Sequence, residues 1–116
     1  MSGRRSRSKG ALGERELANY LTERGFPSRR NARNGISGRD GGQDVAHSLG
    51  PYWIEVKRQE KLAIPAWVRQ AEEDCPPGEV PLVIYRQSRQ PWRVVIQLDD
   101  LLTIITNKEK QHESVS

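Results

Sequence analysis

The sequence predicts a single α/β domain in which a mixed central β-sheet is flanked by helices. Segments with helical periodicity alternate along the chain with short apolar segments that are typical of strands. The length of 116 residues and the apolar content of 34% suit one small domain with a modest core. Such a core would gain further burial if two copies formed a homodimer.

The first expected helix spans residues 11–24. Gly25 followed by Phe26 is typical of a helix that stops in the left-handed conformation. Glu14 extends the apolar stripe and is therefore expected on the buried face, whereas Glu16, about 200° around the helix, is expected to face solvent. The apolar stripe itself consists of Leu17, Ala18 and Leu21.

The remaining elements follow from apolar runs and from the turn residues between them. Strands at 44–47 and 52–58, joined by a turn at 48–51, are expected to form a hairpin that brings Asp44 and Glu55 together. The other expected elements are an extended segment at 27–33, a loop with four glycines at 34–43, a helix from Pro65 to Asp74, strands at 80–86 and 92–98, and a helix that Asp99 caps and that runs through Ile105.

Basic residues are concentrated in the first third of the chain. Residues 1–39 hold ten Lys or Arg against three acids, whereas residues 40–116 hold nine against twelve. Nine of the ten are arginines, which bind phosphate oxygens bidentately, so a nucleic-acid partner is favoured. The alternative is a solvated charged face with a disordered arm. The expected organisation is a basic mobile arm (1–9), a folded domain (10–106) and a polar C-terminal tail (107–116).

Composition also excludes several classes of protein. No stretch approaches the roughly 20 apolar residues of a membrane span, and the basic N-terminus lacks the apolar region of a secretory signal, so a cytoplasmic, intracellular protein is expected. Cys75 is the only cysteine and is interpreted as structural. His47 and His112 are isolated from other ligand types, which argues against a zinc site.

The most informative motif is Glu55-Val56-Lys57 in a segment that otherwise reads as an apolar strand. Side chains two apart on a strand share one face. Burying Glu and Lys there costs several kcal/mol unless they are paired or hold a metal. Asp44 followed by this motif is the layout that a Mg²⁺-dependent phosphodiesterase needs, because two carboxylates suffice to hold Mg²⁺ with its waters. An exposed cross-strand ion pair is the alternative.

Several motifs together resemble the Holliday junction resolvases of the archaeal and phage type, which belong to the PD-(D/E)xK nuclease superfamily. The resemblance implies a restriction-endonuclease-like fold, with residues 10–106 as the nuclease domain, in a prokaryotic cell or a phage-infected host. The motifs are Lys9-Gly10 followed by Glu14-Arg15-Glu16-Leu17, the helix end Arg24-Gly25-Phe26, the Arg33 to Gly38 loop, Asp44, and Glu55-Val56-Lys57 with a helix and two strands after it.

The resemblance also implies roles for individual residues. Glu14, Asp44 and Glu55 match the metal-binding acids, with Mg²⁺ as the expected cofactor and Mn²⁺ as an alternative. Lys57 matches the lysine that contacts the scissile phosphate, and Ser37 falls in a loop whose serine aids cleavage. Gln43 stands where the superfamily name has proline. Gln70 lies where some members place a glutamine that faces the phosphate, although glutamine is also an ordinary residue on a helix surface.

The implied activity is structure-selective, paired phosphodiester hydrolysis that resolves four-way DNA junctions, carried out by a homodimer without membrane partners. Another nuclease of the superfamily, of the nicking or restriction type, and a non-catalytic DNA-binding module are the alternatives. The expected DNA-binding residues are Arg4, Arg5, Arg7, Lys9, Arg15, Arg30, Arg33, Arg39 and Gln70. The candidate dimer face, with an ordinary core role as the alternative, is Trp92, Val94, Ile96, Leu101, Leu102, Ile104 and Ile105.

Overall fold

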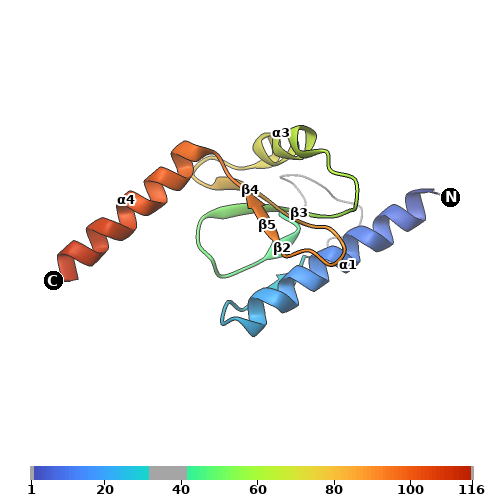
Figure 1. The fold of residues 1–116 in the computed structure, drawn as a ribbon, viewed down its shortest axis with the longest axis horizontal. Coiled ribbons are helices and arrows are strands. Elements are labelled where there is room, and N and C mark those ends of the chain that lie inside the picture. Colours follow the sequence, from blue (N-terminus) through green and yellow to red (C-terminus); the bar gives the residue numbers. More distant parts are fainter. Residues whose placement is uncertain (1, 32–41, 116) are drawn as a thin grey trace.

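The computed structural model describes residues 2–31 and 42–115. Three helices and five strands lie in these ranges (Figure 1). They are α1 (Ser2–Glu23), β1 (Arg29–Arg30), β2 (Val45–Ala46), β3 (Tyr52–Arg58), α3 (Ile64–Asp74), β4 (Val80–Arg86), β5 (Arg93–Val95) and α4 (Leu98–Val115).

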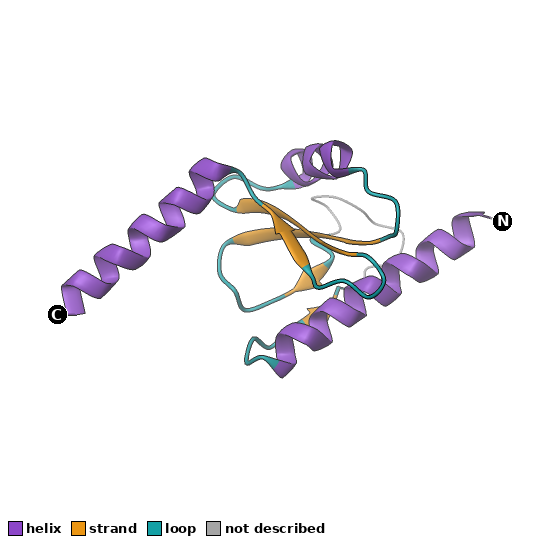
Figure 2. Ribbon diagram, in the orientation of Figure 1, coloured by secondary structure: helices purple, strands orange, loops and turns teal. Residues whose placement is uncertain are grey.

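A three-stranded sheet in the order β3-β4-β5 forms the centre of the domain. β3 pairs with β4 in parallel, from Tyr52↔Val80 to Arg58↔Arg86, and β5 pairs with β4 in the antiparallel sense. Helix α3 connects the two parallel strands (Figure 2). The sheet is therefore mixed and flanked by helices, which confirms the predicted fold class.

The two faces of the sheet carry separate apolar clusters. Alternate residues of a strand point to opposite faces, so Ile54 and Val56 face α1 while Val83 of β4 faces α3. The cluster under α1 is Leu17, Ala18, Val45, Ile54, Val56, Leu82 and Ile84, and the cluster under α3 is Trp67, Ala71 and Val83. Glu55 and Lys57 alternate with the first set and therefore belong to the α3 face.

The predicted hairpin between residues 44–47 and 52–58 is wrong. β2 pairs with β1 instead, through Arg29↔Ala46 and Arg30↔Val45, in a separate two-stranded antiparallel sheet. Asp44 extends this pairing, because its carbonyl oxygen accepts a hydrogen bond of 3.0 Å from the Asn31 amide. Side chains, rather than the backbone of β2, occupy the neighbouring edge of β3.

Two helices are longer than predicted. α1 begins at Ser2 and includes the segment expected as an arm, and α4 runs from Leu98 through Val115 and includes the segment expected as a tail. The extension of α4 is rich in Lys, Glu and Gln, which favour helix even without an apolar face. The extension of α1 holds four Arg or Lys residues among three serines and two glycines, so helix propensity does not account for it. α4 extends away from the sheet (Figure 1). Among the described helices, none combines the length and the apolar content that a bilayer span requires.

The end of α1 is as predicted. Gly25 has a φ of 94°, and the amides of Gly25 and Phe26 donate to the carbonyls of Thr22 and Leu21 at 3.1 and 2.9 Å. These two bonds form a Schellman motif. The stop turns the chain back along the same side of the sheet, where β1 lies beside α1.

Gly13 sets the distance between α1 and β3. A Cβ atom at this position would lie 2.6 Å from Cβ of Arg58 and 3.8 Å from its Cα. Neither atom belongs to the flexible end of the arginine, so a larger residue would push the helix away from the strand. Since Glu14 follows directly, this close approach also places the helical acid beside the sheet.

We predict that Gly13→Ala destabilises the protein, although alanine is the better helix former. Overpacking against Arg58 costs about 1–3 kcal/mol, which exceeds the gain in helix propensity of about 1 kcal/mol. Gly10→Ala is the matched control, because nothing lies within 4 Å of a Cβ atom there. Urea unfolding should show opposite signs for the two variants, and an equal stabilisation by both would contradict the close packing.

Candidate active site

Glu55 lies in the middle of β3, and Lys57 lies two residues further along on the same face of the strand. Glu55 is 7% exposed and is the one buried charged residue among those described. The Lys57 ammonium lies 3.7 Å from Oε1 of Glu55 and donates a hydrogen bond of 3.4 Å to Oε1 of Gln70 on α3. The lysine is thus held between the acid of its own strand and the glutamine of the covering helix.

Asp44 reaches the same place from the residue just before β2. Its Oδ2 accepts a hydrogen bond of 2.9 Å from the backbone amide of Val56, between the two motif residues of β3. The carboxyl groups of Asp44 and Glu55 are also close enough for each to affect the pKa of the other. Two acids therefore meet at the edge of β3, as the sequence predicted, although by a route other than a hairpin.

Glu14 approaches from α1 on the other side of this edge. Its Oε2 lies 3.2 Å from Nε of Arg30, which donates a hydrogen bond to it. Arg30, expected as a DNA-binding residue, is therefore engaged with the helical acid in this structure. The negative charge of Asp44 acts on Glu14, which brings the third acid into the same electrostatic cluster.

The pKa values of the three acids are all raised. Burial raises the pKa of Glu55 to about 8, with the charge of Asp44 adding to the shift and Lys57 opposing it. Burial and then Asp44 raise the pKa of Glu14 to about 7 against the opposing effect of Arg30. Burial also raises the pKa of Asp44, against the Val56 amide and Lys57. The cluster favours bound protons because it brings more negative charge together than the two cations neutralise.

This donor set suits a hard divalent cation. Carboxylate oxygens are the ligands that Mg²⁺ and Mn²⁺ prefer, and a cation would relieve the same repulsion that a proton relieves. Within the described ranges, no three Asp, Glu, His or Cys side chains already form a metal-binding group. Of the three predicted metal-binding acids, Asp44 and Glu55 lie together, whereas Glu14 is engaged with Arg30.

The other predicted site residues are placed as follows. Gln70 is exposed and lies beside Lys57, and Arg15 is exposed on α1 next to Glu14. Arg33, Ser37 and Arg39 lie outside the described residues. For Arg4, Arg5, Arg7 and Lys9, the structure describes the helical backbone but not the side chains.

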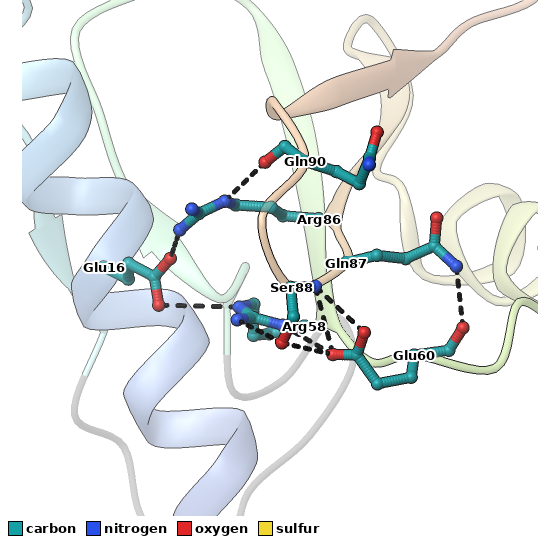
Figure 3. Close-up of polar contacts among 7 residues, drawn as sticks. All are labelled: Glu16, Arg58, Glu60, Arg86, Gln87, Ser88 and Gln90. Carbon is teal, nitrogen blue, oxygen red and sulfur yellow. Dashed lines mark hydrogen bonds and ion pairs between the residues drawn. The ribbon is translucent and has the colours of Figure 1, made fainter.

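The expectation that Glu16 faces solvent is wrong. Its carboxylate binds Nη1 of Arg86 and lies 3.6 Å from Nε of Arg58 (Figure 3). These two arginines are register partners at the ends of β3 and β4. Adjacent like charges repel, and Glu16 stabilises them by lying between them. The helical wheel missed this role because long arginine side chains reach the flank of α1.

The same network fixes the loop that follows Lys57. Glu60 accepts hydrogen bonds from the Ser88 amide at 2.9 Å and the Ser88 hydroxyl at 3.0 Å, and it pairs with Arg58 at 3.1 Å (Figure 3). The Gln87 amide group donates to the Glu60 carbonyl at 2.7 Å. The segment between β3 and α3 is thereby tied to the segment between β4 and β5.

Asp74 is an acidic neighbour of the site that sequence reasoning missed. Its charge raises the pKa of both Asp44 and Glu55. The available signal was its spacing, since Asp74 lies four residues after Gln70 on α3 and therefore on the same helix face. A fourth carboxylate near the cluster strengthens its demand for a cation.

Comparisons with known proteins agree with this geometry. The family described as "Phage putative PDDEXK endonuclease" matches residues 5–116. The solved structure of Archaeoglobus fulgidus Hjc, a Holliday junction resolvase from an archaeal hyperthermophile, superimposes with a TM-score of 0.55. The two chains are 26% identical, over 73% of this chain and 74% of that one. A search of curated proteins found no match. The family match over residues 5–116 shows that this chain belongs to the phage PDDEXK endonucleases, and the meeting of Asp44 with Glu55 and Lys57 of β3 agrees with that membership.

Proposed function

We propose that the chain is a divalent-metal-dependent endonuclease that resolves four-way DNA junctions. The observation that carries the proposal is the meeting of Asp44, Glu55 and Lys57 at one edge of β3, with the charge of Glu14 coupled to them. The likeness to a solved Holliday junction resolvase supports the junction as substrate.

Asp44 and Glu55 are the residues that would hold the ion, Mg²⁺ or Mn²⁺. When bound, the ion would supply positive charge to a phosphate oxygen and would acidify a water for in-line attack. Attack by a water would break the bond between phosphorus and the 3′-oxygen, and the leaving oxygen would take up a proton from solvent, giving a 5′-phosphate and a 3′-hydroxyl. Glu14 completes the proposed set of acids once Arg30 turns to the DNA backbone. Ser37 keeps its proposed role in cleavage.

Lys57 supplies the positive charge that the protein itself brings to the phosphate. At about 4 Å and an effective dielectric of about 20, one such charge contributes roughly 4 kcal/mol before desolvation is deducted. Gln70 holds the ammonium in place by accepting its hydrogen bond. Because the hydrogen bond is long and Gln70 is exposed, the lysine is able to exchange this acceptor for a phosphate oxygen.

Resolution of a four-way junction requires two cuts on opposed strands, and a homodimer with two-fold symmetry supplies two sites. Of the candidate dimer face, Val94, Leu101, Leu102 and Ile105 are exposed, and Leu98 joins them at 66% exposure. Trp92 and Ile96 pack instead against the cluster under α1, so their core role is the better assignment. We propose the apolar stripe of α4, formed by Leu98, Leu101, Leu102 and Ile105, as the contact with a second copy.

A nuclease of the same family that acts on plain duplex is the second candidate. The arginine-rich start of the chain suits either substrate, because phosphate contacts carry no sequence information. A non-catalytic binding module has no need for two adjacent carboxyl groups with raised pKa values. Cleavage of a mobile four-way junction, a flap and a linear duplex of the same sequence, side by side with Mg²⁺, distinguishes the two nuclease candidates.

We predict that Asp44→Asn and Glu55→Gln each lower junction cleavage at least about a hundredfold, because residues that merely support a metal ligand already cost 10–100-fold. Binding to the junction should persist, since both changes remove negative charge from the site. Glu73→Gln, an exposed acid on α3, is the control. A near wild-type rate for either site variant would show that the carboxylate pair is not the catalytic one.

A second prediction concerns pH and the metal-free protein. The folded-state pKa values of Glu14 and Glu55, about 7 and 8, lie above the usual 4.5. A raised acid pKa means that the folded state binds protons more tightly, so the stability that these two groups contribute is fully present below their ordinary pKa of 4.5 and is lost as pH rises through about 8. Mg²⁺ should flatten this decline, and so should Glu55→Gln without metal. Urea unfolding from pH 5 to 9 checks both, and a stability that rises over this range contradicts the shifts.

A third prediction tests the stripe of α4. Leu102→Glu should convert a dimer into a monomer that nicks only one strand of a junction per binding event, because the second site is lost. Asn107→Glu, on the opposite face of the same helix, should leave the dimer intact. Sedimentation and strand-specific labels measure the two effects. A wild-type protein that sediments as a monomer would refute the dimer and favour the general-nuclease candidate.

A further inference from the structure

The outer edge of β3 is closed by side chains. On a strand, alternate amides point to one edge, and β3 uses one edge to pair with β4. At the other edge, the Ile54 amide donates to Oε1 of Gln43 at 2.8 Å, and the Val56 amide donates to Oδ2 of Asp44 at 2.9 Å. Two consecutive side chains thus take the place of a neighbouring strand.

His47 completes this arrangement. Its Nδ1 accepts a hydrogen bond of 3.1 Å from the Leu49 amide, so the ring proton is on Nε2. Nε2 lies 2.8 Å from the carbonyl oxygen of Tyr52 and 3.1 Å from Oε1 of Gln43. The Gln43 oxygen therefore has two donors, His47 and Ile54, which fixes the orientation of its amide group.

The backbone around Gln43 is held as well. Nδ2 of Asn31 donates to the Gln43 carbonyl at 2.8 Å. Gly42 has a φ of 80°, and a Cβ atom there would lie 2.7 Å from the same Nδ2, so this position requires glycine. The residue before the catalytic aspartate is thus restrained through its backbone and its side chain.

We propose that Gln43 and His47 are positioning residues that hold Asp44 against β3, so that one carboxylate oxygen accepts a hydrogen bond from the Val56 amide and the other would be available to a divalent cation. Gln43 occupies the position that is proline in the superfamily name. In this chain, a side-chain network restrains that position in place of the rigid proline ring. The inference rests on the proposed function, because it assigns the network to a metal-binding acid. It adds two residues to a site whose expected members are Glu14, Ser37, Asp44, Glu55 and Lys57.

The test uses the full chain without DNA and two variants, Gln43→Leu and His47→Phe. Amide exchange followed by NMR should show that Ile54 exchanges at least about tenfold faster in Gln43→Leu, because its acceptor is gone. Mn²⁺ binding, followed by electron paramagnetic resonance, should weaken about 10–100-fold in Gln43→Leu and less in His47→Phe. Gln90→Leu, an exposed glutamine between β4 and β5, is the control and should change neither quantity.

Further readouts separate positioning from general damage. Gln43→Glu keeps an acceptor oxygen for Ile54 and should keep the slow exchange of that amide. In the cleavage assay, Gln43→Leu should lower kcat and leave KM for the junction unchanged, and it should add nothing to the loss in Asp44→Asn. The nitrogen shifts of His47 should report the tautomer with the proton on Nε2.

Several outcomes would overturn the inference. Unchanged Ile54 exchange and unchanged Mn²⁺ binding in Gln43→Leu would show that the network does not hold Asp44. If Gln43→Leu fails to fold, His47→Phe carries the test, and its unchanged exchange and Mn²⁺ binding would count in the same way. If wild-type protein binds no Mn²⁺ and cleaves nothing, the proposed function fails, whereas the exchange result still decides whether the network exists.

Discussion

The unpaired edge of β3 is the constraint on which the candidate site depends. A buried strand edge needs a partner for each amide, and here Gln43 and Asp44 supply side-chain oxygens to Ile54 and Val56. An acid is therefore drawn to the same strand that carries Glu55. The contacts that satisfy the backbone amides of β3 also bring Asp44 to Glu55. The site therefore forms without a ladder between β2 and β3.

Charge balance is the second requirement of the molecule. At the site, burial and mutual repulsion raise the pKa values of Glu14, Asp44 and Glu55. On the α1 face of the sheet, Glu16 lies between Arg58 and Arg86, and together with Glu60 it balances the two cations that the parallel register places side by side. The first cluster is left with excess charge and the second is not. The first cluster is therefore a candidate cation site, whereas the second is an ion-pair network that holds α1 on the sheet.

Packing connects these two clusters through α1. Gly13 lets the helix approach Arg58 closely, and the two acids that follow it then reach different partners, Glu14 pairing with Arg30 and Glu16 with Arg58. A short segment of one helix thus carries a site acid, a close-packing glycine and a structural ion pair. A change at Gly13 should consequently affect stability and the position of Glu14 together.

The α/β class, the stop of α1 at Gly25, the helix that begins near Pro65 and the nearness of Asp44 to Glu55 could be predicted from the sequence, because local periodicity, turn residues and charges within apolar segments are visible in neighbouring residues. The remaining features depended on the packed chain, including the route by which Asp44 reaches β3. The pairing of β2 with β1, the partners of Glu16, the approach of Asp74 and the roles of Gln43 and His47 depend on contacts between distant segments. Long side chains and strand edges have several possible partners of this kind, and the packing of the whole chain determines which contact forms.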